Sequence, residues 1–451
     1  MKKNNKVEKN KKKKKIVPYS KKELLFNVIS LLFAIGVGLY FGGRSFFYYS
    51  KEFMRIETEA LTLNGTITNN NYTVTDGEGL HQDTDGYYFK GNTLNNYVKF
   101  GNRLFRIIRI NNDNTVRVVS DDIVSSFMWG EDNNYVNSNL DKWLDKKEDV
   151  NGSGIYYDTI PYVEDYLEKT TYTIPVFDGK SVVNGKKELS SYVTTLSIKD
   201  YSTANGKNSY LNIGKYFWLV GTDEEDNNLY VSEDGSLLDG SLYETYGIRP
   251  VFTFKKNTPI VGGIGTKDDP YVINQGDKTN MINETIKINN DIWRVHYDKD
   301  NIVKATLYKY VGGSFIYSDE SSEFNLLDRG SAAEYLNNSF LSSLPYNNNL
   351  QDMTIYTGEV SGDTSLDFTN IYNNNTIAKI GLLNMFDYHI LGVDDYYLSN
   401  TTSNKGTMVY VYHDYGILEE VQITEPKAMI VTASFKKDDL IKSNDGYYTV
   451  R

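Results

Sequence analysis

The hydrophobic pattern of the chain begins with an uncharged, mostly apolar run from Leu24 to Gly43. As a helix rising about 1.5 Å per residue, this run would span roughly 30 Å, the thickness of the hydrocarbon core of a bilayer. Eleven lysines lie in the first 23 residues, and lysine beside a membrane span stays on the cytoplasmic side. The pattern therefore predicts a single-pass protein of the cell membrane, with a cytoplasmic N-terminus and extracellular C-terminal modules.

A cleaved signal peptide is the alternative interpretation of the same run. Such a signal ends at small residues suited to cleavage. Here Arg44, Ser45 and Phe46 follow the run instead. The flanking residues favour a retained anchor, so the membrane is the first predicted partner of the chain.

Beyond the run, short apolar segments alternate with turns rich in Asn, Gly and Asp. The clearest example is Leu104–Ile110, followed by a turn at 111–114 and then by Thr115–Val119. This pattern is typical of antiparallel strands joined by tight turns. A helix is predicted within Ser138–Lys147, where Leu, Trp and Leu recur at helical spacing.

The same order of elements occurs twice along the chain. Phe105-Arg106 and Trp293-Arg294 each lie in a strand that is followed by a turn and another strand. Later segments pair in the same order: 139–144 with 331–336, which aligns Trp143 with Tyr335; 216–219 with 395–398, which aligns Trp218 with Tyr397; and 229–231 with 408–410. The sequence predicts an α+β fold: an N-terminal transmembrane helix, then two tandem modules of short antiparallel strands with one or two helices each.

The border between the modules is placed at Gly262–Ile273, where glycine, paired aspartates and proline mark a turn-rich boundary. The predicted parts are a basic cytoplasmic tail (1–22), the transmembrane helix (23–43), a stalk and linker (44–75), module 1 (76–256), a linker (257–275), module 2 (276–437) and a C-terminal tail (438–451).

Composition excludes several classes of function. The chain has no cysteine, which rules out thiolate catalysis, thiolate zinc sites and iron–sulfur clusters. Residues 1–23 carry a net charge of +9, which leaves −20 for the rest of a chain whose total is −11. Nucleic-acid binding needs clustered Lys and Arg. An acidic main body therefore predicts no nucleic-acid partner.

Two polar clusters are candidates for chemical sites. His389 and His413 lie near several aspartates and could form an acid–base or metal site if they converged, but they lack ligand spacing, so surface histidines are favoured. The acidic segment Asp223–Asn228 could bind calcium, yet it lacks the ligand pattern of a calcium loop. A solvated hairpin loop is the preferred interpretation. The sequence predicts no metal, no cofactor and no catalytic residue.

Five segments carry a family resemblance: Asn95–Phe100, Leu104–Ile108, Trp143-Leu144, Trp218-Leu219 and Gly247–Val251. In this order they resemble the DUF6273-type modules of bacterial surface proteins, which are similar to the C-type-lectin and formylglycine-generating-enzyme fold. The resemblance implies two lectin-like modules. Enzymatic relatives hold copper through cysteines, which this chain lacks. Lectin relatives bind calcium with a Glu-Pro-Asn string, and Glu425-Pro426-Lys427 lacks the amide oxygen at its third position.

Aromatic residues are the remaining signal, because Tyr and Trp stack on sugar rings and form contacts with proteins. The candidate ligand-binding residues are Tyr156, Tyr157, Tyr162, Tyr166, Trp218, Tyr396 and Tyr397. The irregular stretch 145–210 would provide the binding surface. The sequence predicts non-catalytic recognition or adhesion, with a glycan or protein ligand. A structural or assembly subunit of an envelope complex, and a surface hydrolase with its site in module 2, are the alternatives.

Overall fold

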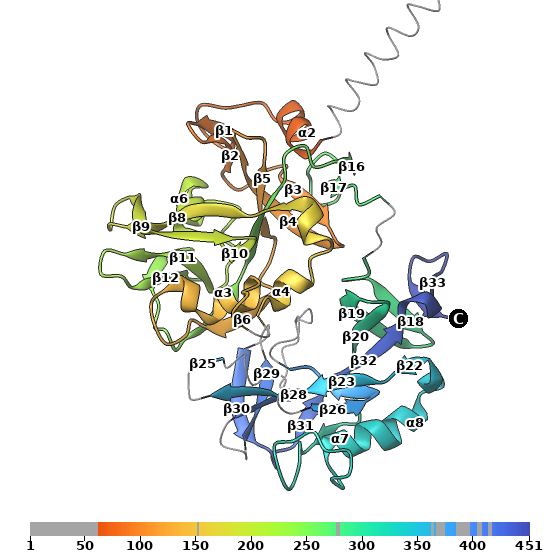
Figure 1. The fold of residues 1–451 in the computed structure, drawn as a ribbon. Helices are drawn as coiled ribbons and strands as arrows, with labels where there is room; N and C mark the ends of the chain where they lie inside the picture. The colour runs from red at the N-terminus through yellow and green to blue at the C-terminus, as the bar shows by residue number, and fades with distance from the viewer. Residues whose placement is uncertain are drawn as a thin grey trace, which may run out of the picture. The chain divides into compact units, whose positions relative to one another are not determined.

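The computed structural model describes residues 62–150, 153–276, 280–361, 365–366, 375–384, 397–403, 408–413 and 417–451 (Figure 1). The predicted span, Leu24–Gly43, lies outside these ranges. Within them, no helix has the length and apolar character needed to cross a bilayer. This finding does not support the prediction of a single-pass protein of the cell membrane, and that prediction is corrected.

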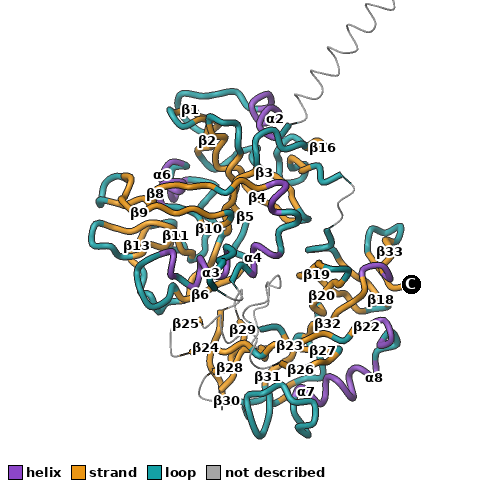
Figure 2. Tube along the Cα trace, in the orientation of Figure 1, coloured by secondary structure: helices purple, strands orange, loops and turns teal. Residues whose placement is uncertain are grey.

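The α+β prediction is wrong, because the described chain is mostly β. Figure 2 shows that strands and loops make up most of the fold and that its helices are short. The sequence favours hairpins because asparagine tolerates the left-handed backbone that tight turns require. Asn102, Asn114 and Asn289 adopt positive φ angles of 59°, 69° and 56° at such turns.

The first sheet contains ten strands. They are β1 (Gly79–Asp83), β2 (Gly86–Lys90), β3 (Tyr97–Phe100), β4 (Arg103–Asn111), β5 (Val116–Ser120), β7 (Leu167–Glu168), β10 (Val193–Thr195), β15 (Pro250–Phe254), β16 (Ile260–Gly262) and β17 (Tyr271–Ile273). The main path runs β10-β15-β5-β4-β3-β17-β16. Every residue of β5 is buried, and the residues of β4 are buried or half-buried, so this part of the sheet forms the centre of the first core.

A second sheet accompanies it, with the path β13-β12-β11-β14-β6 and the hairpin β8–β9 attached to β11. Its strands are β6 (Ser125–Met128), β8 (Thr170–Phe177), β9 (Val182–Ser191), β11 (Phe217–Asp223), β12 (Asn228–Val231), β13 (Leu237–Asp239) and β14 (Thr245–Ile248). The helices that connect these strands are α3 (Asn139–Leu144), α4 (Ile155–Asp158), α5 (Val163–Tyr166) and α6 (Ile198–Thr203), with 3-10 turns at Tyr135–Asn137 and Gly206–Asn208. We call the elements from β1 to β17 the first repeat.

The second repeat runs from β18 to β34. Its first sheet contains β18 (Thr285–Ile288), β19 (Asp291–Lys299), β20 (Ile302–Leu307), β22 (Leu350–Gln351), β27 (Ile380–Leu382), β32 (Val431–Lys436), β33 (Leu440–Lys442) and β34 (Tyr448–Val450). Its second sheet contains β21 (Ser314–Phe315), β24 (Gly358–Ser361), β25 (Ser365–Leu366), β28 (Tyr397–Ser403), β29 (Met408–His413), β30 (Ile417–Gln422) and β31 (Lys427–Met429). Strands β23 (Met353–Tyr356) and β26 (Asn375–Ala378) pair with each other, and the helices are α7 (Ala332–Tyr335), a π turn (Leu336–Phe340) and α8 (Leu341–Ser343), with 3-10 turns at Asn347–Asn349 and Lys437–Asp439.

The first sheets of the two repeats share strand order and pairing register. The path β15-β5-β4-β3-β17-β16 corresponds to β32-β20-β19-β18-β34-β33. Phe105 pairs with Val98 in the first repeat, and Trp293 pairs with Ile286 in the second. A β-bulge follows at the same distance after each of these two aromatic residues. The register therefore agrees with the alignment of Phe105-Arg106 with Trp293-Arg294.

The alignment of the second sheets needs a correction of one residue. Phe217 pairs with Gly247, and Tyr397 pairs with Ala428. Gly247 and Ala428 each lie three residues before the next strand, β15 or β32. Tyr397 is therefore equivalent to Phe217 and not to Trp218. A one-residue shift exchanges the two faces of a strand, and the apolar runs here fit either register equally well.

Several segments expected to lie outside the modules are parts of sheets. The predicted linker 257–275 contains β16 and β17, and the predicted C-terminal tail 438–451 contains β33 and β34. Tyr271 pairs in parallel with β3, and Tyr448 pairs in the same way with β18. Part of the predicted stalk forms α2 (Leu63–Asn70), whose Leu63 and Ile67 are buried in the first core. Strands this short carry too few residues for a periodic pattern.

Candidate functional site

Four of the predicted aromatic ligand residues are buried. Tyr156, Trp218 and Tyr397 are 0% exposed and Tyr166 is 8% exposed. Trp218 donates its indole N–H to the carbonyl of Phe127 at 2.8 Å. Their rings stabilise the fold, because burial in a packed core leaves no ring face for a ligand.

Of the other three predicted residues, the structure describes two. Tyr157 is half-buried, and its ring meets that of Tyr192 edge to face at 5.6 Å. Tyr162 is 43% exposed and precedes α5 with a positive φ of 53°. Tyr396 lies outside the described residues. The structure therefore brings none of the described members together around a cavity.

The predicted polar clusters are placed only in part. His389 and the side chain of His413 are outside the described part of the chain. Asp223 closes the β11–β12 turn, where its carboxylate accepts hydrogen bonds from the backbone N–H groups of Glu225 and Asn227 at 2.9 and 2.8 Å. Across the described ranges, no group of three His, Asp or Glu side chains is arranged to hold a metal ion.

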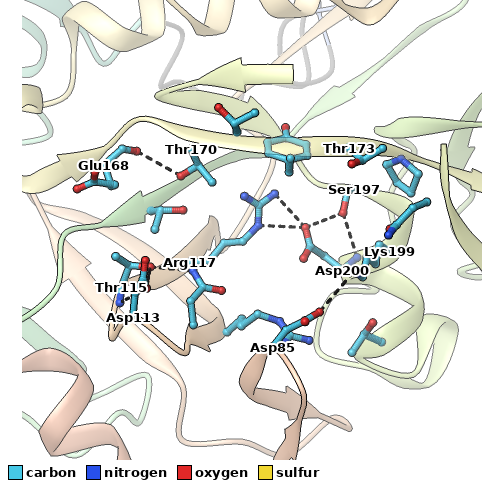
Figure 3. Close-up of a pocket in the computed structure, with 18 of the residues that line it drawn as sticks. Asp85, Asp113, Thr115, Arg117, Glu168, Thr170, Thr173, Ser197, Lys199 and Asp200 are labelled. Carbon is cyan, nitrogen blue, oxygen red and sulfur yellow. Dashed lines mark hydrogen bonds and ion pairs between the residues drawn. The ribbon is translucent and has the colours of Figure 1, made fainter. Parts of the chain in front are cut away.

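A pocket of about 630 Å³ lies elsewhere in the first repeat. This volume is within the range of small-molecule sites, roughly 300–1,000 Å³. Its walls come from β4, β5, the segment from β7 into the β8–β9 hairpin, and α6 (Figure 3). The stretch 145–210, which the sequence predicted as the binding surface, thus supplies one wall, mostly through polar side chains and with one tyrosine, Tyr172.

The centre of the pocket is an ion pair between Arg117 and Asp200. The Arg117 Nε and Nη2 atoms donate to one carboxylate oxygen, Oδ2, at 3.2 and 3.1 Å. The Ser197 hydroxyl donates to the same oxygen at 2.7 Å (Figure 3). Both side chains are about nine-tenths buried. A buried charge needs a partner of this kind, since its desolvation is otherwise costly.

Local sequence explains how Asp200 is held. Ser197 is the N-cap of α6, and its hydroxyl accepts the backbone N–H of Asp200 at 3.0 Å. A serine followed three residues later by an acidic residue is a known helix-start pattern. The cap fixes the first turn of α6, and that turn aims the carboxylate at Arg117.

The electrostatics keep these groups in defined charge states. Burial lowers the pKa of Arg117, but the neighbouring Asp200 carboxylate outweighs burial and raises the pKa above its usual value. The guanidinium lies 5.1 Å from the ring centroid of Tyr172. Burial raises the pKa of Tyr172 to about 12. At neutral pH the pocket therefore contains a charged guanidinium beside a neutral phenol.

Two further cationic side chains of the pocket are paired with carboxylates. Arg109 makes a bidentate ion pair with Asp83, both bonds being 2.7 Å long. Lys199 lies 3.6 Å from Asp85. The lining contains four cationic side chains and four carboxylates: Arg109, Arg117, Lys169 and Lys199, with Asp85, Asp113, Glu168 and Asp200. The net charge of the lining is therefore zero, which gives no excess attraction for an anion.

Hydroxyl groups are the other main component of the lining. They belong to Thr115, Thr170, Thr171, Thr173, Ser197, Thr203 and Thr253. The buried Thr253 Oγ1 has no hydrogen-bond partner among the described residues. The described residues that line the pocket include no histidine, the usual base that activates a serine or threonine nucleophile. The arrangement can bind a polar molecule through hydrogen bonds from several sides.

No protein-family model, curated protein or solved structure matches this chain. The resemblance to lectin-like modules therefore stays a prediction. Sequence reasoning missed Arg117, Asp200 and Thr253 as site residues. One signal could have found the first: arginine in an otherwise apolar strand needs a polar partner. The pattern of Ser197 followed by Asp200 could have placed the second.

Proposed function

We propose that this protein is a non-catalytic recognition protein, and that the pocket of the first repeat binds a neutral, hydroxyl-rich ligand such as a saccharide. The observation that supports it best is the composition of the pocket wall. Every arginine in the lining is already paired with a carboxylate, and hydroxyls are the most numerous kind among the other polar groups.

This chemistry matches a sugar better than an anion. A sugar hydroxyl both donates and accepts hydrogen bonds, and carboxylates, guanidinium groups and threonine hydroxyls together satisfy both roles. Phosphates and carboxylate ligands prefer arginines that are free for bidentate bonds. Here Arg117 is already paired with Asp200, and Arg109 with Asp83.

The proposal is tested by calorimetric titration of the full chain. The probes are glucose, galactose, mannose and N-acetylglucosamine, each as mono-, di- and trisaccharides, together with glucose 6-phosphate and glucuronate as anionic counterparts. We expect saturable binding of at least one neutral probe and weaker binding of its anionic counterpart. Stronger binding of the anionic probes, or no binding by any neutral probe, would contradict the proposal.

A substitution locates the binding in the pocket. The Thr171 side chain is exposed, and its hydroxyl donates to Ser190 at 2.9 Å. We expect Thr171→Val to weaken binding of the neutral probe roughly fivefold, since one hydrogen bond contributes about 1 kcal/mol. Thr354 pairs with β26 as Thr171 pairs with β9, so Thr354→Val is the matched control and should leave the affinity unchanged.

A further inference from the structure

The two repeats place different residues at the position of the pocket. Arg117 pairs with Thr253 between β5 and β15, and Lys304 pairs with Ser434 between β20 and β32. The short strands β7 and β22 meet these same residues, through Glu168 in the first repeat and Gln351 in the second. The register thus makes Lys304 the counterpart of Arg117, and Ser434 the counterpart of Thr253.

Thr170 and Met353 are the counterparts that matter most. Each lies two residues after the short strand residue that pairs with Thr253 or Ser434. Each also begins a strand that forms a hairpin-like pair, β8 with β9 and β23 with β26. Thr170 lines the 630 Å³ pocket and is half-buried, whereas Met353 is only 7% exposed.

Met353 fills the space that Thr170 leaves open. The Ser434 hydroxyl contacts the Met353 sulfur at 3.2 Å, while the equivalent Thr253 hydroxyl has no partner among the described residues. Next along the strand, the buried Ile355 stands where the first repeat has Tyr172. The cavity whose lining includes Lys304, Met353 and Ile355 measures about 20 Å³, which is room for about one water molecule.

The arginine–aspartate ion pair at the centre of the pocket has no counterpart among the described residues of the second repeat. Lys304 lies 5.2 Å from the ring centroid of Tyr297. Tyr297 pairs with Lys304 as Arg109 pairs with Arg117. One rim arginine is thus replaced by an aromatic ring, and the central guanidinium is replaced by an ammonium group that cannot make a bidentate pair.

From these contacts we infer that Thr170 and Met353 determine which of the two equivalent positions binds: Thr170 keeps the saccharide pocket of the first repeat open, and Met353 closes the equivalent position of the second. This inference rests on the proposed function for the identity of the ligand. The difference between an open and a closed position does not depend on that identity, so it can be tested without any ligand.

The first test uses the absence of cysteine from the chain. Thr170→Cys and Met353→Cys are made separately in the full chain, and each is treated with N-ethylmaleimide in native buffer and in denaturant. We expect the thiol at position 170 to react at least tenfold faster than that at 353 in native buffer, and both to react alike in denaturant. Equal native rates would overturn the inference. Should Met353→Cys fail to fold, Ser434→Cys takes its place, because Met353 then still covers the thiol.

The second test is the stoichiometry of the neutral saccharide that binds best in the calorimetric titration. We expect one site per chain, and loss of at least tenfold in affinity for Thr170→Met, which places a sulfur beside Thr253 as in the second repeat. Met353→Leu, a swap of similar volume, should leave binding unchanged. Two sites per chain, or full binding by Thr170→Met, would overturn the inference while the proposed function stands. A clear difference in thiol reactivity with no saccharide bound would overturn the proposed function alone.

Discussion

At the scale of single residues, the most unusual group is the buried carboxylate of Asp141. Its side chain is 0% exposed, and its ion pair is with Lys147 at 2.7 Å. Burial raises the pKa of Asp141 to about 7, and the nearby Lys147 offsets only part of that rise. Asp145 shares the same lysine at 3.7 Å, and burial raises its pKa as well.

This carboxylate predicts a pH dependence of stability. Between about pH 4 and pH 7 the folded chain keeps a proton on Asp141 that the unfolded chain has released. The free energy of unfolding should therefore fall as pH rises, by at most about 1.4 kcal/mol per pH unit for this group. Urea unfolding at pH 5, 6, 7 and 8 measures the slope.

Asp141→Asn should flatten the slope, because the amide does not titrate in this range. Asp226→Asn is the control, since Asp226 is exposed and pairs with the exposed Lys187. A slope in Asp141→Asn equal to that of the unchanged protein would contradict the assignment to this group. Any slope left after the substitution belongs to Asp145 and the other titrating residues.

At the scale of elements, each repeat starts its main helix with the same cap. Ser138 precedes α3, and its hydroxyl accepts the N–H of Asp141 at 3.1 Å. Ser331 precedes α7 and accepts the N–H of Glu334 at 3.2 Å. Counted from the caps, Trp143 is equivalent to Leu336. The sequence alignment matched Trp143 with Tyr335, so that alignment needs a shift of one residue.

Removing either cap should destabilise its own repeat. We expect Ser138→Ala and Ser331→Ala each to lower the free energy of unfolding by about 1 kcal/mol, the usual contribution of an N-cap hydroxyl. Denaturant titration measures the change. Ser202→Ala in α6 is the control, because Ser202 is exposed and should change stability by less than about 0.5 kcal/mol. A loss for Ser202→Ala as large as that for the caps would argue against the cap assignment.

At the scale of the whole molecule, each repeat is completed by a late hairpin that returns to its first sheet. The hairpin β33–β34 follows the last long strand, and Tyr448 pairs with Ile286 at the sheet edge. Lys437 also donates to Asp298 at 2.7 Å. Without this hairpin, β18 would present an unpaired edge, which is a site for aggregation.

Deletion of residues 437–451 should therefore destabilise the second repeat. We expect a lower denaturation midpoint for this repeat, together with greater aggregation on concentration. Intrinsic fluorescence of Trp293, the tryptophan of the second repeat, follows the transition once the other three tryptophans are replaced by phenylalanine. Lys299→Ala in the full chain is the control, because this exposed side chain lies outside the hairpin and should not affect the midpoint. An unchanged midpoint after the deletion would show that the hairpin adds nothing to the fold.

The sequence by itself determined the hairpins and much of the repeat. Strands such as β4 and β5 were predictable because apolar segments and asparagine turns are local signals. The equivalence of Phe105 and Trp293 in the two repeats followed from those signals. It also excluded thiol chemistry throughout, because the chain has no cysteine. The α+β class was wrong because strands of two or three residues leave no periodic pattern in the sequence, whereas even a short helix does.

The tertiary structure alone decided where a ligand can bind. Arg117 and Asp200 are far apart along the chain, and only the pairing of β5 with β15 and the packing of α6 bring them within 3.1 Å. Four of the aromatic residues that suggested a binding surface proved to be core, since burial depends on neighbours that no local pattern specifies. The same holds for Thr170 and Met353: their equivalence follows from strand register, and register is set by the long-range fit of buried faces.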